Sequence, residues 1–219
     1  MFEAVILTTI PELTQKEFDD LLPLVSSEKQ KRIKHFHFFW DAQNCLLGDL
    51  LARVEICRFT DIRMKQIEFA VNEYGKPFVV DKPRTQFNIS HTDHYIACII
   101  ADEPVGIDIE LIKNADMKIA ERFFTPDETA YIIDDKWQAN RFYEVWTKKE
   151  SRIKWEGKGL YKPLPSFSVF ESSNQEQLTY HKVFHNDKAI CHVCSTKQSP
   201  PSVKVIDTAT FIQRIIKCE

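Results

Sequence analysis

The hydrophobic positions along the chain change their spacing from one segment to the next, and each spacing predicts a type of element. Leucines at intervals of three and four predict a long helix that begins near Asp41, and a second long helix is expected at residues 141–155. The mixture of this spacing with short apolar stretches indicates an α+β fold. Those stretches, bounded by turn residues, predict strands at residues 4–9, 67–71, 77–80, 87–89, 95–101, 105–110, 167–170, 178–184 and 189–195.

The helix starts indicate that the order of the elements repeats. Thr14, Ser26 and Thr125 are good N-cap residues, and a glutamate follows three positions after the two threonines. Ser26 and Thr125 are 99 residues apart, and the two long helices keep the same offset. We therefore predict a weak duplication into an N-terminal half, residues 1–103, and a C-terminal half, residues 104–219. Residue identity between the halves is poor, so chance similarity of element order is the alternative.

Composition narrows the class of protein that carries these elements. The chain has 219 residues, 43% of them hydrophobic, and a net charge of −3. It can therefore bury a core and is not a basic protein that coats nucleic acid. The longest apolar run, residues 96–101, is far shorter than the ~20 residues that span a bilayer. Six cysteines are too few for a disulfide scaffold, and Cys191 and Cys194 lack the second pair of a structural zinc site. We expect a soluble cytoplasmic protein without nucleic-acid or membrane partners.

Two carboxylates lie close together in the strand predicted at residues 105–110. Asp108 and Glu110 are two residues apart and point to one face, while Ile107 and Ile109 point to the other and can anchor the strand in the core. Neighbouring carboxylates repel each other, and a hard, oxygen-seeking cation between them would remove that repulsion. The alternative is the exposed polar face of an edge strand, which alternation also produces.

The second long helix adds a third carboxylate and a cation. Glu150 borders the apolar stripe of this helix, and Lys154 lies one turn beyond it on the same side. Together they would supply a further metal ligand and a contact for a phosphate group. The alternative is an ordinary glutamate–lysine pair that stabilises the helix by a few tenths of a kcal/mol.

Side chains suited to phosphate lie in three other segments. Ser90 and His91 are expected in a polar turn after the strand at residues 87–89, where they could hold a phosphate or only cap the turn. Lys29 and Arg32 lie three apart on one helix face, which could grip a phosphate or simply be solvated. An aromatic ring, a flexible backbone and a cation, suited to a purine base, come together in the turn Tyr74-Gly75-Lys76-Pro77.

These segments together resemble the surfactin-synthetase-type 4′-phosphopantetheinyl transferases in order and spacing, over nearly the whole chain. Gly-Ile-Asp-x-Glu alone is modest support, and the downstream Trp-x-x-Lys-Glu-Ser-x-x-Lys makes the resemblance strong. The motifs that carry it are Tyr74-Gly75-Lys76-Pro77, Phe87-Asn88-Ile89-Ser90-His91, Gly106-Ile107-Asp108-Ile109-Glu110, Phe123-Phe124-Thr125-Pro126-Asp127-Glu128, Trp146-x-x-Lys149-Glu150-Ser151-x-x-Lys154 and Glu156-Gly157-Lys158-Gly159-Leu160.

The resemblance implies a fold and an activity. Two similar α+β halves would form an intramolecular pseudo-dimer with coenzyme A in the cleft. The N-terminal half would bind the coenzyme, and the C-terminal half would carry the metal motif and the catalytic helix. A monomer of this kind uses Mg²⁺ to move the 4′-phosphopantetheine arm of coenzyme A to a serine of an apo acyl or peptidyl carrier protein. The other product would be adenosine 3′,5′-bisphosphate.

The resemblance also implies roles for single residues. Asp108, Glu110 and Glu150 match the Mg²⁺ ligands, and Lys154 matches the lysine at the coenzyme pyrophosphate. Glu150 could accept the proton of the carrier serine, and Lys154 could neutralise or protonate the leaving group. The expected coenzyme contacts are Lys29, Arg32, Tyr74, Gly75, Lys76, Pro77, Ser90, His91 and Lys154.

Three positions qualify the resemblance. Arg32 stands where relatives carry lysine, which keeps the charge. Asn44 stands where a close relative has arginine, so any nucleotide contact made by that arginine is in doubt. Glu128 matches an acidic family position, but the capping box that begins at Thr125 explains it nearly as well.

The segment after the second long helix is expected to meet the carrier protein, as it does in the related transferases. Residues 157–169 are punctuated by Gly and Pro, and Phe167 is expected to face the core. Leu160 and Tyr161 have no obvious partner in the helical stripe, and Lys158 and Lys162 could steer an acidic carrier. The alternative is a packed loop that only links a helix to a strand.

Two other function classes remain open from the sequence. A non-catalytic module for coenzyme A or a nucleotide would keep Lys29, Lys76 and His91 but would not need the three carboxylates. A Mg²⁺-dependent phosphohydrolase would keep the carboxylates and use water in place of the serine.

Overall fold

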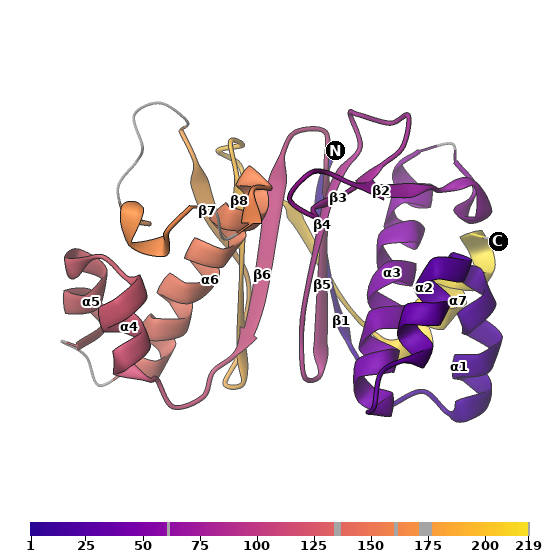
Figure 1. The fold of residues 1–219 in the computed structure, drawn as a ribbon, viewed down its shortest axis with the longest axis horizontal. Helices are drawn as coiled ribbons and strands as arrows, with labels where there is room; N and C mark the ends of the chain where they lie inside the picture. The colour runs from indigo at the N-terminus through magenta and orange to yellow at the C-terminus, as the bar shows by residue number, and fades with distance from the viewer. Residues whose placement is uncertain (61, 134–136, 160–161, 171–176, 219) are drawn as a thin grey trace.

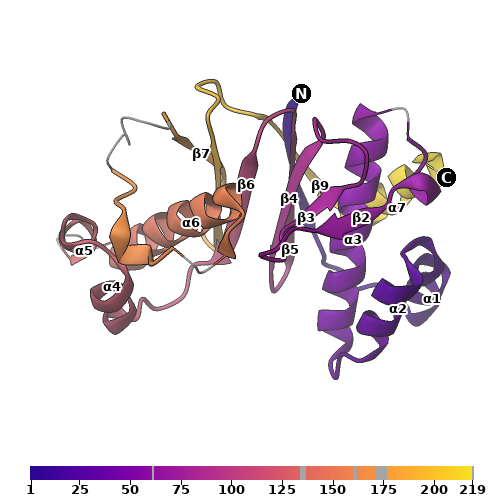
Figure 2. The ribbon, with the colours of Figure 1, turned by 45° about the horizontal axis from the view of Figure 1, so that its top comes forward.

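The structure, a computed structural model, describes residues 1–219 except 61, 134–136, 160–161, 171–176 and 219. Two sheets lie face to face at the centre, with helices on their outer sides (Figures 1 and 2). The first sheet has the strand order β4-β5-β1-β9 and the second has the order β6-β8-β7. Among the described helices, none combines the length and apolar character that crossing a membrane requires.

The first half follows the predicted order closely. Thr14 caps its first helix through the expected capping box with Glu17, and Ser26 accepts a hydrogen bond from the Lys29 amide at the start of the second. The predicted strand–turn–strand at residues 67–80 is the short β2–β3 hairpin. The elements are β1 (Phe2–Thr8), α1 (Gln15–Leu21), α2 (Ser27–Lys34), α3 (Phe39–Phe59), β2 (Phe69–Val71), β3 (Pro77–Val79), β4 (Gln86–Thr92) and β5 (Tyr95–Ala101).

The second half repeats the order of elements of the first. In each half a strand is followed by short helices, one long helix, a 3₁₀ turn and a hairpin, β4–β5 in the first half and β7–β8 in the second. The β2–β3 hairpin of the first half comes in addition. In each sheet the second strand of the hairpin pairs antiparallel with the first strand of that half, giving β4-β5-β1 and β7-β8-β6. The prediction of two similar α+β halves is therefore confirmed. The elements are β6 (Val105–Leu111), α4 (Met117–Phe123), α5 (Pro126–Ile133), α6 (Gln138–Glu156), β7 (Thr179–His185) and β8 (Ala189–Ser195).

Both halves also fix the chain after the long helix with a buried cation. In each case the cation donates to two backbone carbonyls three residues apart, at the 3₁₀ turn that follows. These hydrogen bonds, 2.7–3.4 Å long, run from Arg53 to Met64 and Ile67, and from Lys149 to Leu164 and Phe167. The cations have different acidic partners, Asp49 for Arg53 and Glu128 for Lys149. The two halves thus share this pair of cation–carbonyl hydrogen bonds, although the cation is an arginine in one half and a lysine in the other.

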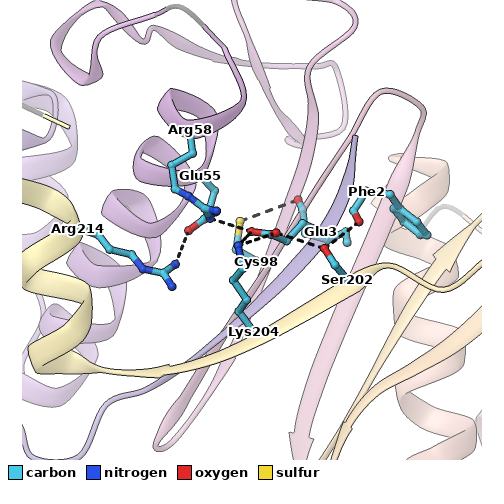
Figure 3. A network of polar contacts seen from close by, with 9 residues as sticks. Phe2, Glu3, Glu55, Arg58, Cys98, Ser202, Lys204 and Arg214 are labelled. Atoms are coloured by element: carbon cyan, nitrogen blue, oxygen red, sulfur yellow. Dashed lines mark hydrogen bonds and ion pairs between the residues drawn. The ribbon is translucent and has the colours of Figure 1, made fainter. Parts of the chain in front are cut away.

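The end of the chain returns to the first half. β9 (Ser202–Asp207) pairs parallel with β1, and α7 (Thr208–Cys218) packs against α3. Figure 3 shows the polar network at this junction, where Glu3 and Glu55 lie among Arg58, Lys204 and Arg214. The division at residue 104 stays a prediction. We expected residues 104–219 to form the second half, but β9 and α7 lie with the first half.

The two sheets share one core layer. β1 is buried on both faces: Val5 and Leu7 pack toward α3, while Ala4 and Ile6 pack toward the second sheet. From the second sheet, Ile107 and Ile109 of β6 enter the same inter-sheet layer, as their alternation predicted. The other face of β6 is therefore turned toward α6, and it carries Asp108 and Glu110.

The strand expected at residues 167–170 does not form. Its backbone groups bind buried side chains instead of a neighbouring strand: the Phe167 carbonyl accepts from Lys149 at 2.7 Å, and the Val169 amide donates to Glu128 at 2.8 Å. Lys149 and Glu128 are themselves fully buried and form an ion pair at 2.8 Å. The apolar residues predicted a strand. The polar side chains that bind its backbone instead are distant in sequence, so the local pattern did not reveal them.

Candidate active site

A pocket of about 390 Å³ opens between the two halves, and it gathers half of the predicted site residues. β4 contributes one wall and β6 and α6 the other. The lining residues are Ile89, Ser90, His91, Asp108, Glu110, Trp146, Glu150 and Lys154. The carboxylates and the lysine singled out from the sequence thus face one space, together with the serine and histidine from the other half.

Three elements position these side chains. Alternation along β6 turns Asp108 and Glu110 toward α6, and Glu150 and Lys154 lie one turn apart on that helix. β6 and α6 approach closely at Gly106, where a Cβ atom would overlap the Ser151 carbonyl. Only a residue without a side chain permits this approach.

Ser90 and His91 differ from their prediction. They lie within β4 and not in a turn after it, because the pairing of β4 with β5 continues to Thr92. A regular strand holds the Ser90 side chain toward the second half more firmly than a turn would. The turn-capping alternative for these two residues is therefore wrong.

Lys154 and Asp108 are joined directly on one wall of the pocket. The Lys154 Nζ atom donates to Asp108 Oδ1 at 2.6 Å and to Ser90 Oγ at 2.8 Å, and the Ser90 hydroxyl donates to the same carboxylate oxygen at 2.9 Å. Asp108 is 3% exposed. Its second oxygen, Oδ2, is buried and has no hydrogen-bond partner among the residues that the structure describes. A buried carboxylate oxygen without a donor is costly and marks a place for a cation.

The pocket holds more acidic groups than its lysine can neutralise. Burial, followed by the charge of Asp108, raises the pKa of Glu110 to about 7. The same two causes raise the pKa of Glu150. Burial and the charge of Lys154 lower the pKa of His91. In the described part of the chain, no three His, Cys, Asp or Glu side chains form a ready-made metal cluster. The carboxylates share the pocket without converging on one point.

Replacing Glu110 with glutamine is expected to remove a contribution to stability that grows as the pH falls. The folded pKa of Glu110 is about 7 and its ordinary value is 4.5, so in this window Glu110 binds more protons in the folded chain than in the unfolded chain. The free energy of unfolding contributed by Glu110 therefore rises as the pH falls from about 7 toward about 4.5. Urea titrations of the metal-free wild type and of Glu110→Gln, at about pH 5, 6 and 7, would measure the difference. Identical slopes in the two proteins would contradict the assignment.

The Tyr74-Gly75-Lys76-Pro77 turn lies beside a second pocket. The buried ammonium of Lys76 donates to the carbonyls of Val105 (3.1 Å) and Trp155 (3.3 Å), and burial lowers its pKa to about 8. Lys76 thereby ties the first half to β6 and to the end of α6. Lys76 and Pro77 line this pocket of about 270 Å³, while Tyr74 is exposed. A coenzyme role for this turn stays a prediction.

Lys29 and Arg32 lie on α2, outside the lining of the main pocket. Lys29 is half-buried, 3.7 Å from Asp49, and its charge helps to lower the pKa of His91. Arg32 is exposed on the same helix face, three residues on. Of the two, Lys29 is therefore the one near enough to His91 for its charge to act on the pocket.

The structure decides the role of Glu128. Its carboxylate accepts hydrogen bonds from the Thr125 and Val169 amides at 2.8 Å and pairs with Lys149 inside the core. It caps α5 and is turned away from the pocket. Asn44 is also buried, and its side-chain amide donates to the Asp93 carbonyl at 3.1 Å.

Trp146 is a pocket residue to which the sequence analysis gave no role of its own. Its place in the Trp-x-x-Lys-Glu-Ser motif was the only signal for the site. It lines the pocket, and a hydrogen bond from it lowers the pKa of Glu110, against the effect of burial.

Comparison with known proteins shows the family to which the chain is similar. Residues 12–104 match the family model "4′-phosphopantetheinyl transferase, N-terminal", and residues 104–210 match the model "4′-phosphopantetheinyl transferase superfamily". The chain is 42% identical over 159 residues to 4′-phosphopantetheinyl transferase Sfp of Bacillus subtilis, covering 72% of this chain and 71% of the relative.

A second relative extends the match. The chain is 40% identical over 184 residues to 4′-phosphopantetheinyl transferase gsp of Aneurinibacillus migulanus, covering 83% of this chain and 76% of the relative. The two family models match the two parts of the chain, which agrees with the two-half fold. The chain therefore belongs to the 4′-phosphopantetheinyl transferase superfamily and is an enzyme of the Sfp-like type.

Proposed function

We propose that the enzyme transfers the 4′-phosphopantetheine arm of coenzyme A to a serine of an apo acyl or peptidyl carrier protein, with Mg²⁺ as cofactor. The second product is adenosine 3′,5′-bisphosphate. The observation that carries the proposal is the pocket in which Asp108, Glu110, Glu150 and Lys154 meet Ser90 and His91 of the other half. Metal-binding and phosphate-binding side chains then face one another across a single space.

The oxygen donors present suit a magnesium ion, which would bring together carboxylates that share the pocket without converging on one point. Asp108 Oδ2 is an oxygen donor without a partner in the described chain, and Glu110 and Glu150 have raised pKa values that a nearby cation would lower. These three carboxylates would hold the ion. When bound, Mg²⁺ supplies charge neutralisation at the phosphoryl centre and the leaving group.

Glu150 and Lys154 would act on protons and charge. A serine hydroxyl is a weak nucleophile until a base accepts its proton. Glu150 borders the pocket, and its raised pKa brings it closer to the working pH of a general base. Lys154 presents its ammonium group toward Asp108 and Ser90, where it would stabilise the negative charge of the departing bisphosphate.

We also propose that the enzyme works as a cytoplasmic monomer. One chain supplies both walls of the pocket, so a second copy is not needed to complete it. All six cysteines are free, which suits a reducing compartment.

The function is tested by incubating the protein with coenzyme A, Mg²⁺ and an apo carrier protein, followed by intact-protein mass spectrometry. Addition of one arm to the carrier supports the proposal. Consumption of coenzyme A without a heavier carrier would indicate the phosphohydrolase instead. Binding of coenzyme A without any turnover would indicate a binding module.

Changing Lys29 and Arg32 together to alanine is expected to raise the KM for coenzyme A about tenfold and to change kcat less. The two cations lie outside the pocket lining and would contact nucleotide phosphates that do not react. The effect should shrink at high salt, because exposed charges are screened. A matched control is Lys31→Ala with Lys34→Ala, which removes two exposed charges of α2 with the same spacing. Equal coenzyme affinity of both double variants would contradict the assignment.

The carrier surface is proposed on the segment that follows α6. Gly157 ends the helix in a left-handed conformation (φ 67°), and Phe167 is buried as predicted. The charge of Lys162 is used within the chain: its ammonium group pairs with Glu156 at 2.6 Å and lies over the Phe167 ring. Lys158 is exposed, so steering of an acidic carrier falls to it. Leu160 and Tyr161 lie outside the described residues.

Lys158→Glu is expected to raise the KM for the carrier several-fold and to leave the KM for coenzyme A unchanged. Reversing one rim charge acts mainly on the association rate, so the effect should be largest at low salt. Lys217→Glu makes the same charge change on α7, in the other half (Figure 1), and serves as the control. A carrier KM that is equal in the two variants would remove Lys158 from the interface.

A further inference from the structure

Two contacts that lie outside the pocket lining help to seat the helix that carries Glu150 and Lys154 on the second sheet. One is Gly106 of β6, which lies directly beneath the backbone of Ser151 and Trp155. The other is a hydrogen bond of 2.7 Å between Thr147 Oγ1 on α6 and His192 Nδ1 on β8. Both side chains of this second contact are buried, with His192 1% exposed. The helix is thus held on two adjacent strands.

The hydrogen bonds of this contact define the state of the histidine. The Thr147 hydroxyl donates its proton to the Tyr143 carbonyl at 2.7 Å, one turn back along α6. Its oxygen then accepts a proton from His192, so Nδ1 carries the hydrogen. Burial lowers the pKa of His192 well below its usual range, which keeps the ring neutral. Nε2 has no partner among the described residues, so the nitrogen that is satisfied is the one that reaches the helix.

The contact at Gly106 lies between the contact at Thr147 and the side chain of Lys154, so it can act as a pivot for the helix. Thr147 lies one turn before Ser151, and Lys154 lies almost one turn after it on the same face. If the contact at Thr147 is lost, α6 can tilt about the Gly106 contact. A tilt at one end then moves the other end in the opposite direction by a similar distance. Lys154 Nζ lies only 2.6 Å from Asp108, so a shift of about 1 Å would disrupt the pocket.

We infer that Thr147 and His192 form a positioning pair that sets the orientation of α6 on the sheet and, through it, the placement of Glu150 and Lys154 against Asp108. The inference rests on the catalytic roles given to those residues in the proposed function. Neither Thr147 nor His192 lines the pocket. His192 lies opposite Asp108 in the pairing of β6 with β8, so Thr147→Val is the variant that tests the effect of the helix alone.

The test compares variants that remove the hydrogen bond with variants that keep it. Thr147→Val and His192→Leu remove it, while Thr147→Ser keeps the hydroxyl and His192→Asn places an amide where Nδ1 lies. We expect the first pair to lower kcat about tenfold, with a smaller change in the KM for coenzyme A. The second pair should stay within about twofold of the wild type. The double variant should be no worse than either single removal, because the two residues act as one unit.

His181→Leu provides the matched control. His181 is also a buried histidine of the second sheet with one hydrogen bond, to the Lys197 carbonyl at 2.8 Å, but it does not touch α6. This variant should lower the melting temperature without changing kcat. A removal variant that behaves like His181→Leu, with lower stability and a normal kcat, would overturn the inference.

A crystallographic readout separates this inference from the proposed function. The distance between Lys154 Nζ and Asp108 is expected to lengthen in Thr147→Val relative to the wild type. If the wild type fails to use coenzyme A, the proposed function is wrong, and the distance still decides the inference. An unchanged distance in Thr147→Val overturns the positioning role whatever the substrate.

Discussion

Asp108→Asn is expected to lower the rate of transfer by about a thousandfold or more while the protein stays folded. Asparagine has nearly the same shape, and it can still accept the hydrogen bond from Ser90. It removes the negative charge that pairs with Lys154 at 2.6 Å and that would bind the metal through Oδ2. Loss of a metal ligand removes several kcal/mol of charge stabilisation at a reacting phosphoryl group, and each ~1.4 kcal/mol is a factor of ten in rate.

The measurement is kcat with a carrier protein at saturating coenzyme A and Mg²⁺, after circular dichroism and thermal unfolding have shown a folded protein. Asp187→Asn is the matched control, because Asp187 is exposed next to the β7–β8 turn. Near-normal turnover of Asp108→Asn in saturating Mg²⁺ would remove Asp108 from the metal site. A raised requirement for Mg²⁺ with a partly restored rate would still agree with a weakened site.

The parts of the fold that local chemistry determines were predictable from the sequence. The alternation at Asp108 and Glu110 put both carboxylates on one face, because side chains along a strand alternate whatever the neighbouring strand is. The helix starts at Thr14 and Ser26 were also correct, since an N-cap side chain bonds to an amide only three residues away.

The errors occur where distant groups decide the local structure. Residues 167–170 are apolar enough for a strand, but Lys149 and Glu128 bind their backbone groups. β9 and α7 were not predicted, and their place beside β1 depends on contacts with residues about 200 positions earlier. A local sequence pattern does not show which distant strand will pair with a given strand, because a β-ladder can join any two strands that meet in space.

The candidate site was predictable in its chemistry and not in its assembly. The residue types suited binding of a metal, a phosphate or a purine base, but each segment except the Tyr74-Gly75-Lys76-Pro77 turn had an ordinary structural alternative. The resemblance to a family was what brought β4, β6 and α6 together before the structure did. Even so, it did not show that Lys76 binds two backbone carbonyls at the junction, or that Glu128 belongs to the core.

Gly106→Ala is expected to damage stability and catalysis together. A Cβ atom at this position would overlap the Ser151 carbonyl oxygen and the Trp155 amide nitrogen, and it would lie 3.0 Å from the Lys154 carbonyl carbon. All three are backbone atoms of α6, which cannot turn aside as a flexible side chain can. The helix must therefore move away from β6, and overpacking of this kind costs about 1–3 kcal/mol, occasionally more.

The same movement would carry Glu150 and Lys154 away from Asp108, so the turnover number should fall about a hundredfold in the fraction that remains folded. Gly48→Ala is the matched control, since its added Cβ would meet only Ile89 and Ile96 methyl groups at 3.7 and 3.9 Å. Gly48 lies inside α3, where alanine is the better helix former by ~1 kcal/mol, so the control should be neutral or stabilising. Urea unfolding and kcat would be measured for both variants. Wild-type stability and turnover in Gly106→Ala would show that the contact between β6 and α6 neither requires glycine nor places the catalytic helix.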